Sequence, residues 1–201
     1  MPTKLFTELD SEKKERITEA ALEEFAEYGY EKGSTNRLVK ACGVSKGSLF
    51  KYFENKEDLY FYLIDCVSAQ MTEEMSLNLS GLSKDLYERV IEYSVSEISW
   101  YIENPVKGRF LIQVASVTGS DIGRKIIERY GEKSTDIYET LLKGVDMSGL
   151  HNGRKVVTDI LKWVLAGFNN SFLESNATSG HNIEAMKKSY IKQLKGYLKV
   201  L

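Results

Sequence analysis

The sequence predicts an all-helical protein of one to two domains, and three observations lead to this expectation. The chain has 201 residues but only two prolines, Pro2 and Pro105, so almost nothing in it forbids helix. Apolar residues recur with helical spacing, and no segment alternates as a strand would. Hydrophobic residues make up 42% and charged residues 28% of the chain, the balance of a soluble globular protein.

Residues that can cap a helix N-terminus precede each helix expected in the first third of the chain: Asp10 or Ser11, Ser34 or Thr35, Ser45, and Asn55. Gly29 ends the first of these helices and Gly43 ends the second. Further helices are expected to start at or near Ser83, Asn104, Ser120, Asn152 and Asn182. The sequence therefore predicts about nine helices. Residues 1–56 form a domain of short helices, and residues 57–201 form a larger domain of long ones.

Charge is unevenly distributed, although the net charge of the chain is only −2. Residues 10–31 carry three basic and eight acidic side chains, a net charge of −5. Residues 32–56 carry six basic side chains against Glu54 alone, a net charge of +5. A solvated basic face is the simplest interpretation of a charge run, but this run coincides with a specific geometry.

Residues 34–53 predict a helix, a tight turn and a second helix. Apolar side chains fix the angle between the helices: Leu38, Val39, Val44, Leu49 and Phe53. The second helix keeps an outward face of polar and basic residues: Lys46, Gly47, Ser48, Lys51 and Tyr52. Such a face suits insertion into the major groove of DNA.

Motifs in a fixed order extend over residues 13–65: Phe25-x3-Gly29-Tyr30, then Thr35, then Ala41-x-Gly43-Val44-Ser45-Lys46-Gly47-Ser48-Leu49, Tyr52-Phe53 and Asn55-Lys56-Glu57-Asp58-Leu59. This segment resembles the N-terminal domain of TetR-type (TetR/AcrR) bacterial transcriptional regulators. The resemblance has no gaps and covers about a quarter of the chain.

By position, the resemblance implies DNA-binding roles for nine residues: Thr35, Asn36, Lys46, Gly47, Ser48, Phe50, Lys51, Tyr52 and Lys56. Thr35 would bond a backbone phosphate, and Asn36 would lie at the edge of the groove. Lys46, with Gly47 and Ser48, would face the bases, where it could reach guanine acceptors.

Tyr52 and Lys56 would hold phosphates and set the register on DNA. The residues alone also allow a packed aromatic at Tyr52 and a solvated helix start at Lys56. Phe50 departs from the family pattern, in which tyrosine is usual, so a purely core role is also open for it.

The resemblance further implies a pocket for a small-molecule effector among the middle helices of residues 57–201. Aromatic and apolar residues are the candidates for its lining: Tyr93, Trp100, Tyr101, Phe110, Val114, Tyr138 and Trp163. Taken singly, a position in the core is the simpler interpretation of each of them. This mostly uncharged set favours an apolar or planar effector.

Two helical faces near the end of the sequence are candidates for an oligomer interface: Val156, Ile160, Trp163, Val164, Gly167 and Ser171 on one, and Ile183, Tyr190, Leu194, Tyr197 and Leu201 on the other. A helix pair from each subunit would make a four-helix bundle. The same faces could pack within one monomer, but the resemblance favours a homodimer. A two-fold dimer would bind a palindromic operator in double-stranded DNA.

No cofactor, metal site or catalytic constellation is expected. His151 and His181 are 30 positions apart and lack ligand spacing to a cysteine. Cys42 and Cys66 are the only cysteines, which indicates a reducing compartment. The sequence shows neither a signal peptide nor an apolar run of membrane-spanning length, so we expect a cytoplasmic protein without a membrane partner.

These expectations describe a ligand-responsive, DNA-binding transcriptional regulator, most simply a repressor that a small apolar or aromatic effector releases from its operator. The alternative is a helical small-molecule-binding protein or enzyme that keeps the N-terminal unit only as a scaffold. The positive charge on residues 32–56 argues against this alternative, because a scaffold needs no such bias.

Overall fold

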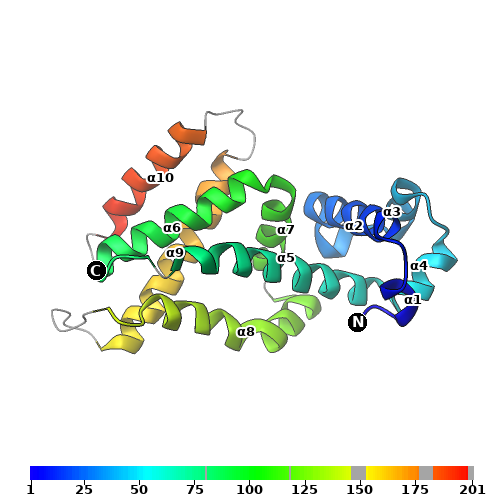
Figure 1. Cartoon of the computed structure of the whole chain (residues 1–201), viewed down its shortest axis with the longest axis horizontal. Helices are drawn as coiled ribbons and strands as arrows, with labels where there is room; N and C mark the ends of the chain where they lie inside the picture. Colours follow the sequence, from blue (N-terminus) through cyan, green and yellow to red (C-terminus); the bar gives the residue numbers. More distant parts are fainter. Residues whose placement is uncertain (80, 118, 146–152, 177–182, 199–201) are drawn as a thin grey trace. The chain divides into compact units, whose positions relative to one another are not determined.

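The computed structural model of the chain describes residues 1–79, 81–117, 119–145, 153–176 and 183–198. These residues form ten helices and no strand (Figure 1). The helices are α1 (Lys4–Thr7), α2 (Ser11–Lys32), α3 (Thr35–Cys42), α4 (Lys46–Tyr52), α5 (Lys56–Leu79), α6 (Leu86–Glu103), α7 (Pro105–Ser116), α8 (Asp121–Leu141), α9 (Arg154–Asn176) and α10 (Ile183–Leu198). The expected all-helical fold is confirmed, and the helix that the sequence did not predict is the single turn α1.

The chain divides into two compact units, which are described separately. Unit 1 comprises Met1–Glu73 and Asn104–Ile126, and unit 2 comprises Glu74–Glu103 and Ile127–Leu201. Helices α5 and α8 therefore contribute to both units. The expected domain boundary after residue 56 stays a prediction, because compact packing does not test which segment folds by itself.

The core of unit 1 is rich in aromatic side chains. Helix α2 packs against α3 and along α7 (Figure 1). Between them the Tyr60 ring meets the edge of Phe25 at 5.0 Å and the edge of Phe110 at 5.4 Å between centroids. All three side chains are at most 1% exposed. Edge-to-face contacts of this kind hold α5 and α7 against α2, the helix on which α3 rests.

Helix α2 is interrupted at Gly29, where the sequence predicts a helix end. The φ angle of 66° at Gly29 lies in the left-handed region, which glycine adopts without a steric penalty. The chain then completes a last turn to Lys32 before Gly33 leads into α3. This kink directs the chain from α2 into the helix-turn-helix segment.

Unit 2 is built around α10, which packs against α6 and α9. Tyr190 and Leu194 of α10 are fully buried there, and the Tyr190 ring lies 5.0 Å from Phe168 and 5.1 Å from Phe172 between centroids. Across the described ranges, no helix is long and apolar enough to cross a bilayer. His151, His181, Leu201 and the side chain of Ile183 lie outside the described residues.

Candidate nucleic-acid interface

Helices α3 and α4 form a helix-turn-helix whose turn is Gly43-Val44-Ser45. Gly43 has a φ angle of 68°, and the Val44 N–H donates to the Val39 carbonyl at 3.2 Å. Ser45 caps α4 by accepting a hydrogen bond from the Ser48 N–H at 3.0 Å. Both ends of the turn are thus closed by local hydrogen bonds, which fixes the direction in which α4 leaves it.

Apolar side chains anchor the motif on the rest of unit 1. Leu38 of α3 and Leu49 of α4 are each 1% exposed, as is Phe53 at the end of α4. Cys42 is buried with them and is a free thiol. The spacing of the apolar residues predicted five contacts between the helices. Leu38, Leu49 and Phe53 are buried as expected, while Val39 and Val44 are only half-buried.

The remaining face of the motif is exposed and basic. Lys46, Gly47 and Lys51 of α4 are exposed, and Ser48 is half-buried. On α3, Asn36 and Lys40 are exposed and Thr35 is half-buried. Within the described part of the chain, the ion pairs leave Lys40, Lys46 and Lys51 unpaired. Three uncompensated cations therefore lie on two short adjacent helices, as an interface with a phosphate backbone requires.

Phe50 and Tyr52 differ from each other in burial. Phe50 is 39% exposed, so it is not a core residue and remains available to a partner. Tyr52 is only 8% exposed and packs beside Phe6 of α1, with 6.1 Å between ring centroids. The phosphate contact expected of Tyr52 stays a prediction, and the tyrosine also has a packing role.

Helix α1 holds the end of α4 in place. The Thr3 N–H donates to the Tyr52 carbonyl at 2.9 Å, and the Thr3 hydroxyl donates to the Lys51 carbonyl at 2.8 Å. Phe6 is 2% exposed, and its ring lies 4.7 Å from Phe53 between centroids. The first residues of the chain thus satisfy carbonyls at the C-terminal end of α4, which have no partner within the helix itself.

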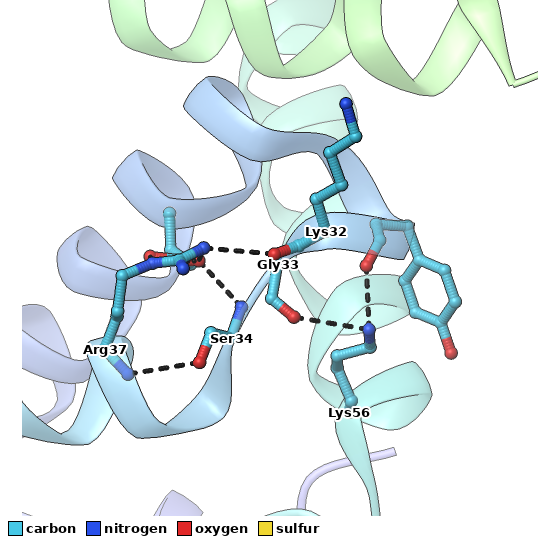
Figure 2. Close-up of polar contacts among 7 residues, drawn as sticks. Lys32, Gly33, Ser34, Arg37 and Lys56 are labelled. Atoms are coloured by element: carbon cyan, nitrogen blue, oxygen red, sulfur yellow. Dashed lines mark hydrogen bonds and ion pairs between the residues drawn. The ribbon is translucent and has the colours of Figure 1, made fainter.

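A carboxylate of α2 organises the start of α3. Glu24 is 8% exposed, and its Oε1 accepts from the Ser34 N–H at 2.7 Å and from Arg37 Nη2 at 2.5 Å. Arg37 Nη2 also donates to the Lys32 carbonyl at 3.0 Å (Figure 2). The guanidinium lies 4.1 Å from the ring centroid of Tyr28. The charge of Arg37 is therefore matched within the domain, and its function is to position α3.

Lys56 joins the start of α5 to the end of α2. Its Nζ donates to the Tyr30 carbonyl at 2.8 Å and to the Gly33 carbonyl at 3.3 Å, as Figure 2 shows. The same ammonium lies 4.4 Å from the centroid of the Tyr30 ring. A contact between Lys56 and a phosphate stays a prediction, and only one of the three N–H groups is left for it.

Glu24, Arg37 and Phe6 position the site, and these roles were not predicted from the sequence. Glu24 lies on the same side of α2 as the buried Ala20, Ala21 and Phe25. A carboxylate on a buried helix face needs a partner for its charge. This pattern was a usable signal. Phe6 gave no comparable signal, because a helix of four residues is too short to show periodicity.

The residues expected to line an effector pocket are divided between the two units. Phe110 and Val114 belong to unit 1. In unit 2, Tyr93 and Trp100 are buried, while Tyr101 and Tyr138 are half-buried. Trp163 is 71% exposed. The expected set is thus divided, since Phe110 and Val114 lie in unit 1 and Trp163 is exposed, and the ligand contacts themselves stay predictions.

The residues expected at a dimer interface fall into two groups that differ in burial. Tyr190 and Leu194 are covered within a single chain. The remaining described members are half-buried or exposed: Ile160, Val164, Gly167, Ser171 and Tyr197. Among the described residues of α9 and α10, the large apolar side chains that are exposed are those of Val156, Trp163 and Tyr197, all of which lie on the faces expected at the interface.

Comparisons with known proteins agree with this geometry. Residues 17–63 match the family described as bacterial regulatory proteins, tetR family. The chain is 38% identical over 78 residues to the HTH-type transcriptional repressor AcnR of Corynebacterium diphtheriae, an alignment that covers 39% of this chain and 40% of that repressor. The matched segment is thus well under two thirds of the length of that relative.

Two solved structures share the fold. A TetR family transcriptional regulator from Chloroflexus aurantiacus superposes with a TM-score of 0.72 at 20% identity, covering 100% of this chain and 96% of that one. The transcriptional regulator FadR from Bacillus subtilis, in complex with stearoyl-CoA, gives a TM-score of 0.69 at 17% identity, covering 90% and 96%. The three proteins named here are transcriptional regulators.

Proposed function

Because the chain belongs to the TetR family of bacterial regulatory proteins, we propose that it is a sequence-specific DNA-binding transcriptional regulator that acts as a repressor. The observation that carries the proposal is the unpaired basic face of α4, with Lys46 and Lys51 exposed on a helix whose other side is anchored by Leu49. A helix held in this way can enter the major groove without losing its core.

Within this proposal the exposed residues have different roles. Lys46 reads a base edge, because it stands at the N-terminal end of the recognition helix and reaches guanine acceptors. Gly47 and Ser48 allow close approach of the backbone. Thr35 and Lys51 bind phosphates, which adds affinity without sequence preference.

The proposal includes a homodimer and an effector. Two copies joined through α9 and α10 present two recognition helices, so the operator is a palindrome with half-sites about one helical turn, ~34–36 Å, or more apart. The exposed Trp163 and Tyr197 support this interface. A small, largely apolar effector in unit 2 releases the DNA. The protein acts in the cytoplasm, where the chromosome is accessible.

The test is fluorescence anisotropy with labelled duplexes from the region upstream of the protein's own coding sequence. We expect Lys46→Ala to lose discrimination between the selected operator and a scrambled duplex by about 1–3 kcal/mol. Lys32→Ala is the matched control, because it removes the same charge from an exposed side chain outside the helix-turn-helix. Equal affinities of the wild-type protein for operator and scrambled DNA would refute sequence-specific regulation.

A further inference from the structure

An exposed aromatic residue lies on α4, the helix that the proposed function places in the major groove. Phe50 is 39% exposed, and within residues 35–52, all of which the structure describes, it is the one large apolar side chain that is exposed. Isolated exposed hydrophobic residues are common on protein surfaces and need no explanation by themselves. The position of Phe50 among the other side chains of α4 is what points to a function.

Phe50 lies near the middle of the exposed face of α4. At about 100° of rotation per residue, the exposed residues follow one another around the helix in the order Lys46, Phe50, Gly47 and Lys51. Leu49 and Tyr52, which are 1% and 8% exposed, lie on the opposite side of α4 and face the core. Phe50 therefore lies between two cations on the face that is open to a partner.

Gly47 leaves space beside the ring. Residues 47 and 50 are three positions apart and so are neighbours on the helix surface. Among the residues that the structure describes, a Cβ atom at position 47 would meet only Ser45 Oγ, at 3.9 Å. The backbone of α4 can thus approach the bases closely here, which brings the Phe50 ring within reach of the floor of the groove.

The chemistry of the Phe50 side chain limits what it can recognise. Phenylalanine has no hydroxyl, so it neither donates to a phosphate nor pairs with the polar edge of a base. The C5-methyl of thymine is the one apolar group among those that distinguish the base pairs in the major groove. A phenyl ring over adenine or cytosine would instead cover an amino group and leave this donor without a partner. Thymine is therefore the base that this side chain favours.

We propose that Phe50 is a specificity-determining residue that selects thymine by packing on its methyl group, beside the base that Lys46 reads. This inference rests on the proposed function, because it concerns the operator of the regulator. Residues 46 and 50 are four positions apart, which is ~6 Å along the axis of α4. For a helix lying along the groove, each half-site then carries a thymine within about two base pairs of the guanine bound by Lys46, since one base-pair step is ~3.4 Å.

Uracil substitution tests this contact, because deoxyuridine lacks the methyl group but keeps the hydrogen-bonding edges of thymine. The probes are fluorescent duplexes that the full-length protein selects from a randomised pool, with each thymine of a half-site replaced in turn, in both half-sites together. We expect one position at which replacement weakens wild-type binding about tenfold, since burial of one methyl group corresponds to roughly fourfold in each half-site. Phe50→Ala should bind the thymine and uracil duplexes with equal affinity.

Two further variants show which effects belong to Phe50. Lys51→Ala removes an exposed cation of the same helix, so it should weaken binding to both duplexes and preserve the difference between them. Leu5→Ala removes an apolar side chain that is 56% exposed on α1, outside the helix-turn-helix, and should leave both affinities unchanged. Circular dichroism of Phe50→Ala checks that the loss of an exposed side chain leaves the fold intact.

The inference is overturned if no thymine of the selected half-sites shows a methyl effect that Phe50→Ala removes, or if the half-sites carry no thymine near a guanine. It is also overturned if Phe50→Ala weakens binding to scrambled duplexes as much as to the selected one, because the ring would then contact the DNA backbone. In each of these cases, specific binding by the wild type leaves the regulator intact. A wild-type protein that selects no sequence overturns the proposed function, and with it any readout by Phe50.

Discussion

The carboxylate of Glu24 on α2 binds the guanidinium of Arg37 on α3, with 2.5 Å between Oε1 and Nη2. The side chain of Glu24 is 7% exposed and that of Arg37 is 50% exposed, so the pair extends from the core to the surface. Glu24 also accepts from the Ser34 N–H at 2.7 Å, the residue that caps α3. One buried group thus sets both the start of α3 and its distance from α2.

Glu24→Gln tests this relationship. The amide keeps the volume of the side chain but loses the charge that holds Arg37, and it replaces one acceptor by a donor. We expect thermal unfolding to report a loss of about 1–2 kcal/mol, a value kept low because Arg37 is half-exposed. Glu23→Gln makes the same charge change at an exposed neighbour and should have no measurable effect. Equal stabilities of the two variants would contradict a positioning role.

Phe6 gives a second prediction about the base of the DNA-reading helix. Its ring packs on Phe53 and Tyr52, so Phe6→Ala opens a gap beneath the end of α4. We expect a loss of about 3 kcal/mol by urea denaturation and faster hydrogen exchange in α4. Leu5→Ala, at a 56% exposed position of the same helix, is the control. Unchanged exchange in α4 would mean that α1 does not brace it.

The helix-turn-helix could be predicted from the sequence in detail, because each of its parts leaves a local signal. Ser34 and Ser45 cap their helices as expected, and Gly43 adopts the left-handed conformation that ends α3. Leu38, Leu49 and Phe53 are buried as their spacing indicates. Interactions between distant residues leave no such signal: the bonds from Lys56 to two carbonyls depend on where α2 and α5 meet.

The C-terminal helices also show that contacts between distant residues could not be predicted from the sequence. Apolar spacing identified a stripe on α10 but not which partner covers it, and Tyr190 and Leu194 are covered within one chain. The hydrogen bond from Asn169 of α9 to Glu97 of α6 was not predicted for a related reason. Glu97 and Asn169 are 72 residues apart in the sequence, and each residue type, taken alone, is typical of a surface position. The four-residue spacing of Tyr93, Glu97 and Tyr101 was the available signal.

Substitutions at Lys56 and Lys51 should distinguish a structural role of a lysine from a role in phosphate binding. Lys56→Ala removes two hydrogen bonds to carbonyls, so we expect a stability loss of about 1–2 kcal/mol. Lys51→Ala removes an exposed, unpaired cation, so stability should hold while the salt dependence of DNA affinity flattens by about one unit. A flatter salt slope for Lys56→Ala as well would support its predicted phosphate contact.

The dimer prediction concerns the exposed apolar residues of α9 and α10. Trp163 is 71% and Tyr197 is 56% exposed in the single chain, so Trp163→Glu with Tyr197→Glu places two charges on the surface without entering the core. We expect this variant to be a folded monomer by light scattering and circular dichroism. Tyr190→Glu should instead unfold unit 2, because it buries a charge and removes the bond to Asn169. A double variant that remains dimeric would show that the interface lies elsewhere.

The last prediction concerns the pH dependence of stability. Burial raises the pKa of Glu97 to about 7 in the folded protein, from an ordinary value of 4.5. Between these two values the unfolded chain releases the proton while the native protein keeps it, so the native state binds more protons and stability falls as pH rises. A difference of this size corresponds to about 3 kcal/mol, fully lost above pH 7.

Glu97→Gln has no proton to lose, so its stability should stay level where that of the wild type falls. We expect similar unfolding midpoints for the two proteins at pH 4.5, and a more stable variant at pH 8. The exposed Glu88→Gln should follow the wild type throughout. Parallel wild-type and Glu97→Gln profiles would show that the carboxyl is ionised in the native state at little cost.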